Sequence, residues 1–147
     1  MKTSLLITAL LLLVGCHSYE KRTYDVTLTN NSAGPVTIWL TKDGPPFEPG
    51  WLAPEDIAIQ SPNQPVHQIS GLVVQAGKTA FTGPRPGQFE PLTSAVLRIY
   101  AGQLKFEQLL AASEDDKRRI DLRLHPGMSN LVVTGTTEAL KVNEPEQ

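Results

Sequence analysis

Two runs of apolar residues at every second position constrain the fold of this chain more than any other feature. They are Tyr24, Val26 and Leu28, then Val36, Ile38 and Leu40. Because side chains of a β-strand point alternately to its two faces, this spacing predicts two half-buried strands. Residues 30–35 between them are rich in Asn, Gly and Pro, which favour turns, so a hairpin or tight corner is expected there.

The same pattern recurs along the rest of the chain and gives eight strand candidates in all. They span residues 24–28, 36–40, 72–74, 79–81, 97–99, 104–106, 120–124 and 131–133. Eight short strands separated by turns favour a sandwich over any parallel α/β fold. We therefore expect an all-β fold, an antiparallel β-sandwich of about 7–8 strands.

Helix is expected at most once. Residues 54–58 begin with Pro54 followed by two acidic residues, which suits the first turn of a short helix. Residues 106–113 are ambiguous, because their alanines and leucines favour helix while the preceding Gly102 favours a hairpin. For this segment we expect a strand followed by a loose turn.

Proline is concentrated in the middle of the chain, with nine of the twelve prolines between Pro45 and Pro91. Proline has no amide hydrogen to donate, so it is confined to loops and edge strands. Residues 43–70 form the least regular stretch, and a loop of this length in a compact domain commonly binds something. This Pro-rich loop is where a binding site is expected first.

The N-terminus has the pattern of an export signal. Lys2 supplies a positive charge, residues 5–14 are almost entirely apolar, and the run stops at Gly15 and Cys16. Ten helical residues rise about 15 Å, half of the roughly 30 Å hydrocarbon core of a bilayer. The segment is therefore interpreted as a signal peptide and not as a membrane span.

Residues 13–16, Leu-Val-Gly-Cys, resemble the lipobox of bacterial lipoproteins. The resemblance implies cleavage before Cys16, a diacylglycerol on its thiol, and an acyl chain such as palmitate on the new amine. In many such lipoproteins an Asp after the cysteine retains the protein at the inner membrane, and here that residue is His17. The resemblance thus favours lipid anchoring to the periplasmic face of the outer membrane.

This interpretation divides the chain into four parts: a signal peptide (1–15), a lipidated tether (16–22), a β-sandwich domain (23–140) and a flexible tail (141–147). The whole chain carries a net charge of −2. Removal of Lys2 with the signal leaves 12 basic against 15 acidic residues, a charge of −3. An acidic chain without a Lys/Arg-rich stripe argues against nucleic acid as a partner.

One stretch carries a further resemblance. It comprises Asn30-Asn31-Ser32, Val36, Trp39-Leu40, Asp43-Gly44, Pro46, Leu52 and Pro54, and it resembles the opening strands of the von Hippel–Lindau β-domain. The resemblance implies a seven-stranded sandwich and transfers no binding residue. Residues 74–81 are similar to an edge motif of immunoglobulin-like sandwiches, which again concerns architecture alone.

No catalytic constellation is visible, so neither an enzyme nor a cofactor is expected. The single cysteine is assigned to the lipid, and no Gly-x-Ser-x-Gly motif occurs. His125 and Met128 suit soft copper, with His67 as a further ligand, but a plain β-turn with Pro126 and Gly127 explains them better, because a blue-copper site also needs a cysteine that the domain lacks. A copper-handling lipoprotein is kept as the alternative function.

Aromatic residues in and before the Pro-rich loop are the candidate binding surface: Trp39, Phe47 and Trp51. If the alternate residues of 36–40 face the core, Trp39 lies on the opposite face. Either the loop folds back and buries it, or it forms a platform for a protein, peptide or glycan partner of the envelope. The function expected is a non-enzymatic, lipid-anchored binding or scaffold module.

Overall fold

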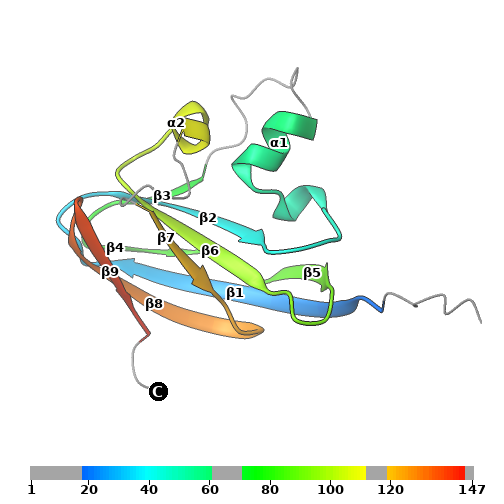
Figure 1. Cartoon of the computed structure of the whole chain (residues 1–147). Coiled ribbons are helices and arrows are strands. Elements are labelled where there is room, and N and C mark those ends of the chain that lie inside the picture. The colour runs from blue at the N-terminus through cyan, green and yellow to red at the C-terminus, as the bar shows by residue number, and fades with distance from the viewer. Residues whose placement is uncertain (1–17, 61–70, 112–118, 145–147) are drawn as a thin grey trace, which may run out of the picture.

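The structure, a computed structural model, describes residues 18–60, 71–111 and 119–144. These form two packed β-sheets with short helices on one side (Figure 1). The strands are β1 (Glu20–Asn30), β2 (Val36–Lys42), β3 (Leu72–Val74), β4 (Lys78–Phe81), β5 (Arg85–Phe89), β6 (Ala95–Ala101), β7 (Arg119–Arg123), β8 (Gly127–Thr136) and β9 (Ala139–Asn143). The helices are the 3-10 turn η1 (Pro49–Trp51), α1 (Pro54–Gln60) and α2 (Phe106–Ala111).

The strand order confirms the expected all-β sandwich. One sheet, the β1 sheet, has the order β4-β1-β8-β9, with β5 also paired to β1; the other, the β2 sheet, has the order β3-β2-β6-β7. All pairs are antiparallel except β1 with β8, which is parallel in the register Tyr24↔Gly127 to Asn30↔Val133. The parallel pair of β1 and β8, at the centre of the β1 sheet, is therefore the one departure from the expected antiparallel arrangement among the described strands.

The main core lies between the sheets and follows the period-two pattern of the sequence. On β1 the alternate residues Tyr24, Val26 and Leu28 are fully buried, and their neighbours on the strand are only partly covered. Ile38 and Leu97 meet them from the β2 sheet. Alternation thus directs one face of each sheet inward, where burial of apolar area provides most of the favourable free energy of folding.

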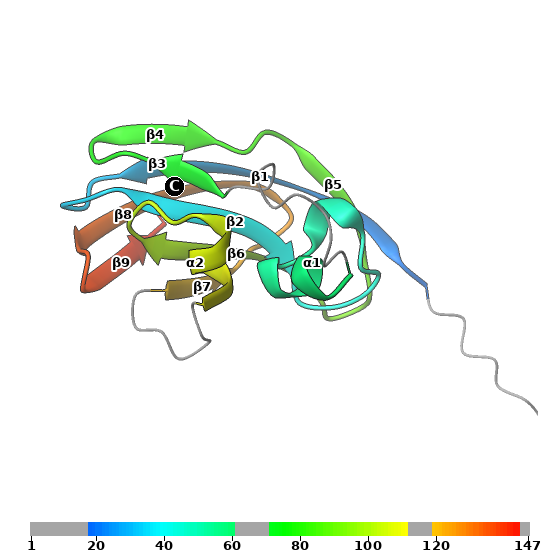
Figure 2. The same cartoon turned by 90° about the horizontal axis from the view of Figure 1, so that it is seen from above.

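A second apolar cluster covers the outer face of the β2 sheet. Trp39 and Tyr100 project from this face and pack against Ile57 of α1 and Phe106 and Leu109 of α2. In Figure 2 both helices lie on the viewer's side of this sheet. Strand β2 is consequently buried on both faces, where the alternation alone predicted burial on one.

The expectation of a strand at residues 104–106 followed by a loose turn is wrong, because residues 106–111 form α2. Phe106 and Leu109 stand three positions apart, so one helical face directs both side chains onto the sheet. The described residues thus contain two α-helices where at most one was expected. Strand alternation from Leu104 would have separated these two side chains onto opposite faces.

The domain extends past both expected boundaries. Strand β1 begins at Glu20, and β9 reaches Asn143, inside the segment expected to be a flexible tail. The signal peptide, Cys16 and His17 lie outside the described residues. Among the residues that are described, no helix is long and apolar enough to cross a bilayer.

Candidate functional site: a groove beside Trp39

Trp39 is covered by the Pro-rich segment that follows it. Its indole Nε1 donates a hydrogen bond of 3.0 Å to the carbonyl oxygen of Leu52, and its ring centroid lies 6.3 Å from that of Phe106. Trp39 is 9% exposed to solvent. Of the two alternatives for Trp39, the structure shows the first: the chain folds back over it, and it forms no exposed platform.

Trp51 belongs to the main core instead. Its ring lies 5.9 Å from Tyr24 and 5.3 Å from Phe89, and its Nε1 donates a hydrogen bond of 3.0 Å to the Pro86 carbonyl. It is 5% exposed, whereas Phe47 is 59% exposed. The three aromatic residues predicted as one binding surface therefore lie in three different environments, and only Phe47 among them is exposed.

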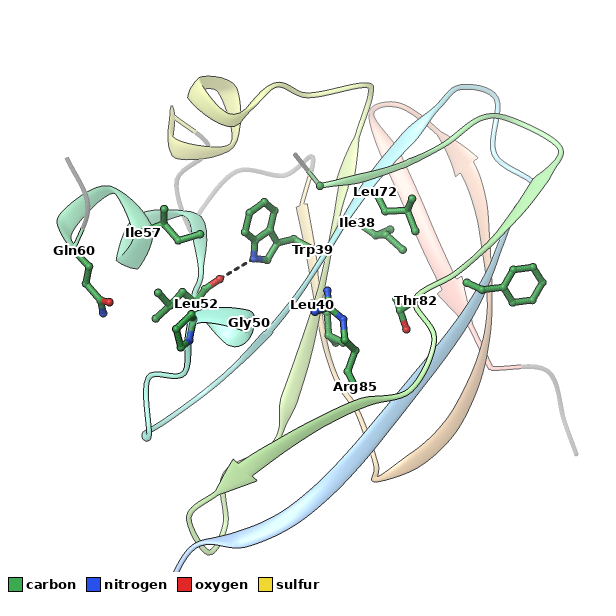
Figure 3. Close-up of a pocket in the computed structure, with 13 residues that line it drawn as sticks. Ile38, Trp39, Leu40, Gly50, Leu52, Ile57, Gln60, Leu72, Thr82 and Arg85 are labelled. Atoms are coloured by element: carbon green, nitrogen blue, oxygen red, sulfur yellow. Dashed lines mark hydrogen bonds between the residues drawn. The ribbon is translucent and has the colours of Figure 1, made fainter. Parts of the chain in front are cut away.

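A groove of about 740 Å³ opens beside Trp39, at the edge of the β2 sheet (Figure 3). It separates η1 and α1 on one side from β4 and β5 on the other. We call it the Trp39 groove. Its lining residues are Ile38, Trp39, Leu40, Pro49, Gly50, Leu52, Ile57, Gln60, Gly71, Leu72, Phe81, Thr82 and Arg85.

The groove extends over both faces of β2. Trp39 faces α1 and Leu52, whereas Leu40 faces the space between the sheets, where Thr82 and Arg85 lie. The edge of β2 therefore passes through the middle of the groove. Apolar side chains line the part of the groove beside α1, and the exposed Arg85 lies at the part beside β5.

Strand β3 pairs with only the first part of β2. The β2–β3 ladder runs from Val36↔Val74 to Ile38↔Leu72 and goes no further. On the other side of β2, Gly102 N donates to Pro35 O and Asp43 N donates to Ser94 O, and Gly102 and Ser94 flank β6. The backbone N–H and C=O groups of the odd-numbered residues of β2 therefore point toward β6.

The backbone N–H and C=O groups of the even-numbered residues of β2 point the other way, toward β3. Leu40 is the first such residue beyond the ladder. Within residues 18–60, 71–111 and 119–144, its backbone N–H and C=O have no partner on that side. In the register of this ladder the position opposite Leu40 is residue 70, which lies outside the described residues.

Arg85 is the charged residue among the groove's lining residues. It occupies the same face of β5 as Gly87 and the buried Phe89 and pairs in register with Tyr24, so it lies on the face of the β1 sheet that is turned toward the β2 sheet, and it is exposed there. A Cβ placed on Gly50 would lie 3.9 Å from Arg85 Nη1, which shows that the guanidinium reaches η1. No residue of the described ranges forms a hydrogen bond or ion pair with the Arg85 side chain.

A buried ion pair holds the segment that forms one side of the groove. Lys42 at the end of β2 is paired with Glu48, just before η1. Burial alone would raise the pKa of Glu48, but the hydrogen bonds from Lys42 Nζ and the Gln88 N–H outweigh it and hold this pKa below its ordinary value. The carboxylate is therefore ionised at neutral pH and fixes residues 43–51 against β5.

The copper alternative gains no support. His125 lies between β7 and β8 and Met128 lies near the start of β8, and both side chains are exposed. Nowhere in the described part of the chain do three or more His, Cys, Asp or Glu side chains gather in a way that could hold a metal ion. His67 lies outside the described residues.

Sequence reasoning found Trp39 and the covering segment but missed the opposite side of the groove. Leu72, Phe81, Thr82 and Arg85 come from β3, β4 and the start of β5. One signal was available for Arg85, because it stands four positions before Phe89 and so shares its face of the strand. Nothing in the sequence indicates that position 85 lies close to residue 39 in the fold.

Comparisons with known proteins leave the family open. No family model matches the chain, and no curated protein matches it, so the von Hippel–Lindau resemblance gains no support. Two solved structures of similar length are similar to it. They are the membrane-bound Lip component of the type VI secretion system from Serratia marcescens (15% identity, 85% of this chain and 99% of that chain, TM-score 0.35) and the type VI secretion lipoprotein TssJ1 from Pseudomonas aeruginosa (14% identity, 87% and 99%, TM-score 0.35).

A third solved structure, that of listeriolysin O, is matched over 85% of this chain and 22% of its own length, at 11% identity and a TM-score of 0.31. With TM-scores this far below 0.5, function has to be argued from the residues of this chain.

Proposed function

We propose that this chain is an exported, lipid-anchored β-sandwich module of the bacterial envelope that binds a partner protein through the Trp39 groove, without enzymatic activity. The observation that carries the binding role is the groove itself, where apolar walls meet Arg85, which has no partner among the described residues. Binding sites commonly combine an apolar concave surface with a few oriented polar groups.

The anchor rests on the signal peptide and on the lipobox ending at Cys16. Only His17, Ser18 and Tyr19 separate that cysteine from Glu20, the first residue of β1. Four residue steps of extended chain span at most about 14 Å. A lipid on Cys16 would therefore hold the sandwich close to the bilayer surface, and the absence of Asp at position 17 favours the outer membrane.

The anchor is tested by the intact mass and membrane fractionation of the full chain beside Cys16→Ala. We expect a mass increment of diacylglycerol and acyl chain on the wild type, which the variant lacks, and release of the variant from the membrane. A wild-type protein of unmodified mass that fractionates with soluble proteins would contradict the anchor.

The binding role is tested in cells with a photocrosslinking amino acid placed at one of two exposed leucines. Leu72 lines the groove, and Leu92, which is 92% exposed, does not line it. We expect one recurrent crosslinked protein from position 72 and none of that mass from position 92. A third placement at Phe47 tests the surface expected from the sequence. Equal patterns at 72 and 92 would rule out the groove as the binding site.

A further inference from the structure

Three exposed apolar residues lie at the end of the sandwich where β1 begins. Tyr19, Phe47 and Leu92 are 42%, 59% and 92% exposed. Glu20 pairs with Phe89, so Tyr19 lies beside the end of β5 and the turn that follows it. Figures 1 and 2 show the start of β1, the end of β5 and the segment after β2 at the same end of the molecule. We call this the tether end, defined by Tyr19, Phe47 and Leu92.

Phe47 belongs to the tether end because the segment that carries it is fixed on both sides of the turn after β5. At the start of this segment, Asp43 Oδ1 accepts a hydrogen bond of 2.6 Å from Ser94 N. At its end, Glu48 Oε2 accepts one of 3.1 Å from Gln88 N. The exposed Phe47 ring and the turn are therefore parts of one surface.

Leu92 lies at the tip of this turn, in a backbone conformation that leucine rarely adopts. Thr93 N donates to Glu90 O at 3.2 Å and closes a β-turn with Pro91 and Leu92 as its central residues. The φ of Leu92 is 70°, a region that glycine occupies freely and a residue with a Cβ does not. Because Leu92 is almost fully exposed, no contact among the described residues offsets this strain. Strain of this kind is characteristic of functional positions.

The anchor proposed above brings the tether end to the membrane. Four residue steps from Cys16 to Glu20 span at most about 14 Å. The turn between β8 and β9 lies beyond the opposite end of β1, since Asn30 pairs with Val133 near the end of β8. An 11-residue strand is about 33 Å long, so that far end is held well away from the lipid.

The side chains of the tether end suit the boundary between lipid headgroups and acyl chains. Leucine and phenylalanine gain free energy when they leave water for this region, and tyrosine is enriched at headgroup level. The acidic Glu20 beside them is paired with Arg22 at 2.7 Å, so it brings no uncompensated charge to the surface.

We propose that the tether end is a membrane-contact surface, on which Leu92 enters the lipid bilayer while Tyr19 and Phe47 lie at headgroup level. This rests on the lipid anchor proposed above and adds which end of the sandwich faces the lipid. A lipid on Cys16 alone would leave the sandwich free to turn about its tether. A second contact through Leu92 holds it in one orientation.

The test places a nitroxide spin label at position 92 of the full-length, lipidated protein. Cys16 is the single cysteine of the sequence and carries the lipid, so Leu92→Cys supplies the one free thiol. In vesicles of phosphatidylethanolamine and phosphatidylglycerol, collisions of the label with oxygen are compared with collisions with a water-soluble nickel chelate. We expect the oxygen-to-nickel ratio to be several-fold higher at position 92 than at Glu138→Cys, in the exposed turn at the far end. Equal ratios would overturn the proposal.

Leu92→Gly separates contact with lipid from a role in the fold. Glycine accepts a φ of 70° without strain, so the variant should not lower the midpoint of thermal unfolding. A label at Phe47→Cys should nevertheless lose several-fold in its oxygen-to-nickel ratio when Leu92→Gly is added, and keep it with Leu92→Met. An unchanged ratio in the glycine variant would show that Leu92 does not hold this end in the lipid, and the proposal fails.

Failure of the anchor and failure of this contact give different results. A protein of unmodified mass that fractionates with soluble proteins would refute both. A lipidated protein whose label is as accessible to nickel at position 92 as at position 138 would refute the membrane contact alone. One recurrent protein crosslinked from position 92 in cells would then identify the tether end as a surface for a protein and not for lipid.

Discussion

Lys42 Nζ donates a hydrogen bond of 2.6 Å to Glu48 Oε2, and the Lys42 side chain is only 1% exposed. The same ammonium group donates to the Gln88 carbonyl at 2.8 Å and lies 5.0 Å from the centroid of the Phe89 ring. One cation therefore joins β2, the Pro-rich segment and β5. Since these segments line the groove, the ion pair fixes the separation of its sides.

Replacement of Lys42 by Met tests this role, because Met keeps most of the apolar stem and removes the charge. Loss of one partner of a buried ion pair costs about 3–5 kcal/mol, and Glu48 keeps part of its contact with water. We expect the free energy of unfolding to fall by about 2–3 kcal/mol in urea titrations. Lys21→Met, at an exposed position of β1, is the control, and an equal small effect of both variants would show that the pair contributes little.

The lowered pKa of Glu48 predicts a pH dependence. A carboxyl group whose pKa is lower in the folded state stabilises the protein above its unfolded pKa, near 4.5, and this contribution is lost as the pH falls through the folded value. The stability difference between wild type and Glu48→Gln should therefore be present at pH 7 and shrink below about pH 4.5. Urea titrations at both pH values measure it.

The Lys42→Met background provides the control for this pH effect. Without the ammonium group, the largest favourable contact of Glu48 is gone. The stability difference that Glu48→Gln causes in that background should then depend less on pH. A pH dependence of unchanged size would mean that the Gln88 N–H, and not Lys42, sets the pKa of Glu48.

The sequence predicted the sandwich because the relevant signal is local. Alternation at Tyr24, Val26 and Leu28 reports which side chains face inward, and all three are buried. The same signal could not predict that β1 pairs in parallel with β8, since the choice of neighbour depends on contacts about 100 residues away along the chain. Local pattern determines the faces of a strand, whereas its partners depend on the whole fold.

Trp39 shows how far the candidate site could be predicted from the sequence. Its position opposite Ile38 and Leu40 correctly indicated a face that needs a cover, and α2 supplies part of that cover. For residues 106–113 the sequence favoured a strand followed by a loose turn, because their composition fits both helix and strand. The neighbouring sheet decides between the two. Trp39 and Tyr100 project from it, and a helix covers both of them with Phe106 and Leu109.

Gly87 allows Trp51 to pack against β5. A Cβ at this position would lie 2.6 Å from Trp51 Nε1 and 2.9 Å from Phe89 Cε2, both closer than van der Waals contact allows. The two rings are buried and have little room to shift. Gly87→Ala should therefore reduce the free energy of unfolding by about 1–3 kcal/mol, the usual cost of overpacking a core.

Gly50→Ala is the matched control for Gly87→Ala. A Cβ at Gly50 would have its nearest neighbour at 3.9 Å, an ordinary contact. Thermal unfolding should separate the two variants clearly, with a lowered midpoint for the Gly87 variant alone. If both variants unfold like the wild type, the core around Trp51 accommodates the extra methyl group and the packing argument fails.

Arg98 holds helix α1 against the β2 sheet. Its Nη1 donates to both oxygens of Glu55, at 2.9 and 2.8 Å, and its side chain lies mostly buried on β6. Burial would lower the pKa of Arg98, but the nearby Tyr100 hydroxyl and the hydrogen-bonded Glu55 carboxylate outweigh this, and the pKa lies above its ordinary value. The guanidinium therefore stays charged and depends on Glu55 for its counter-charge.

Glu55→Ala should consequently loosen α1 before the rest of the domain. Removal of a charged hydrogen-bond acceptor costs about 1–2 kcal/mol at a partly exposed site. We expect faster amide hydrogen exchange in α1 and unchanged exchange in α2, which packs on the same face of the sheet. Glu107→Ala, an exposed residue in the first turn of α2, is the control. Equal acceleration of amide exchange in both helices would instead indicate general destabilisation. Because Ile57 and Gln60 of α1 line the groove, crosslinking from position 72 should also weaken in the Glu55 variant.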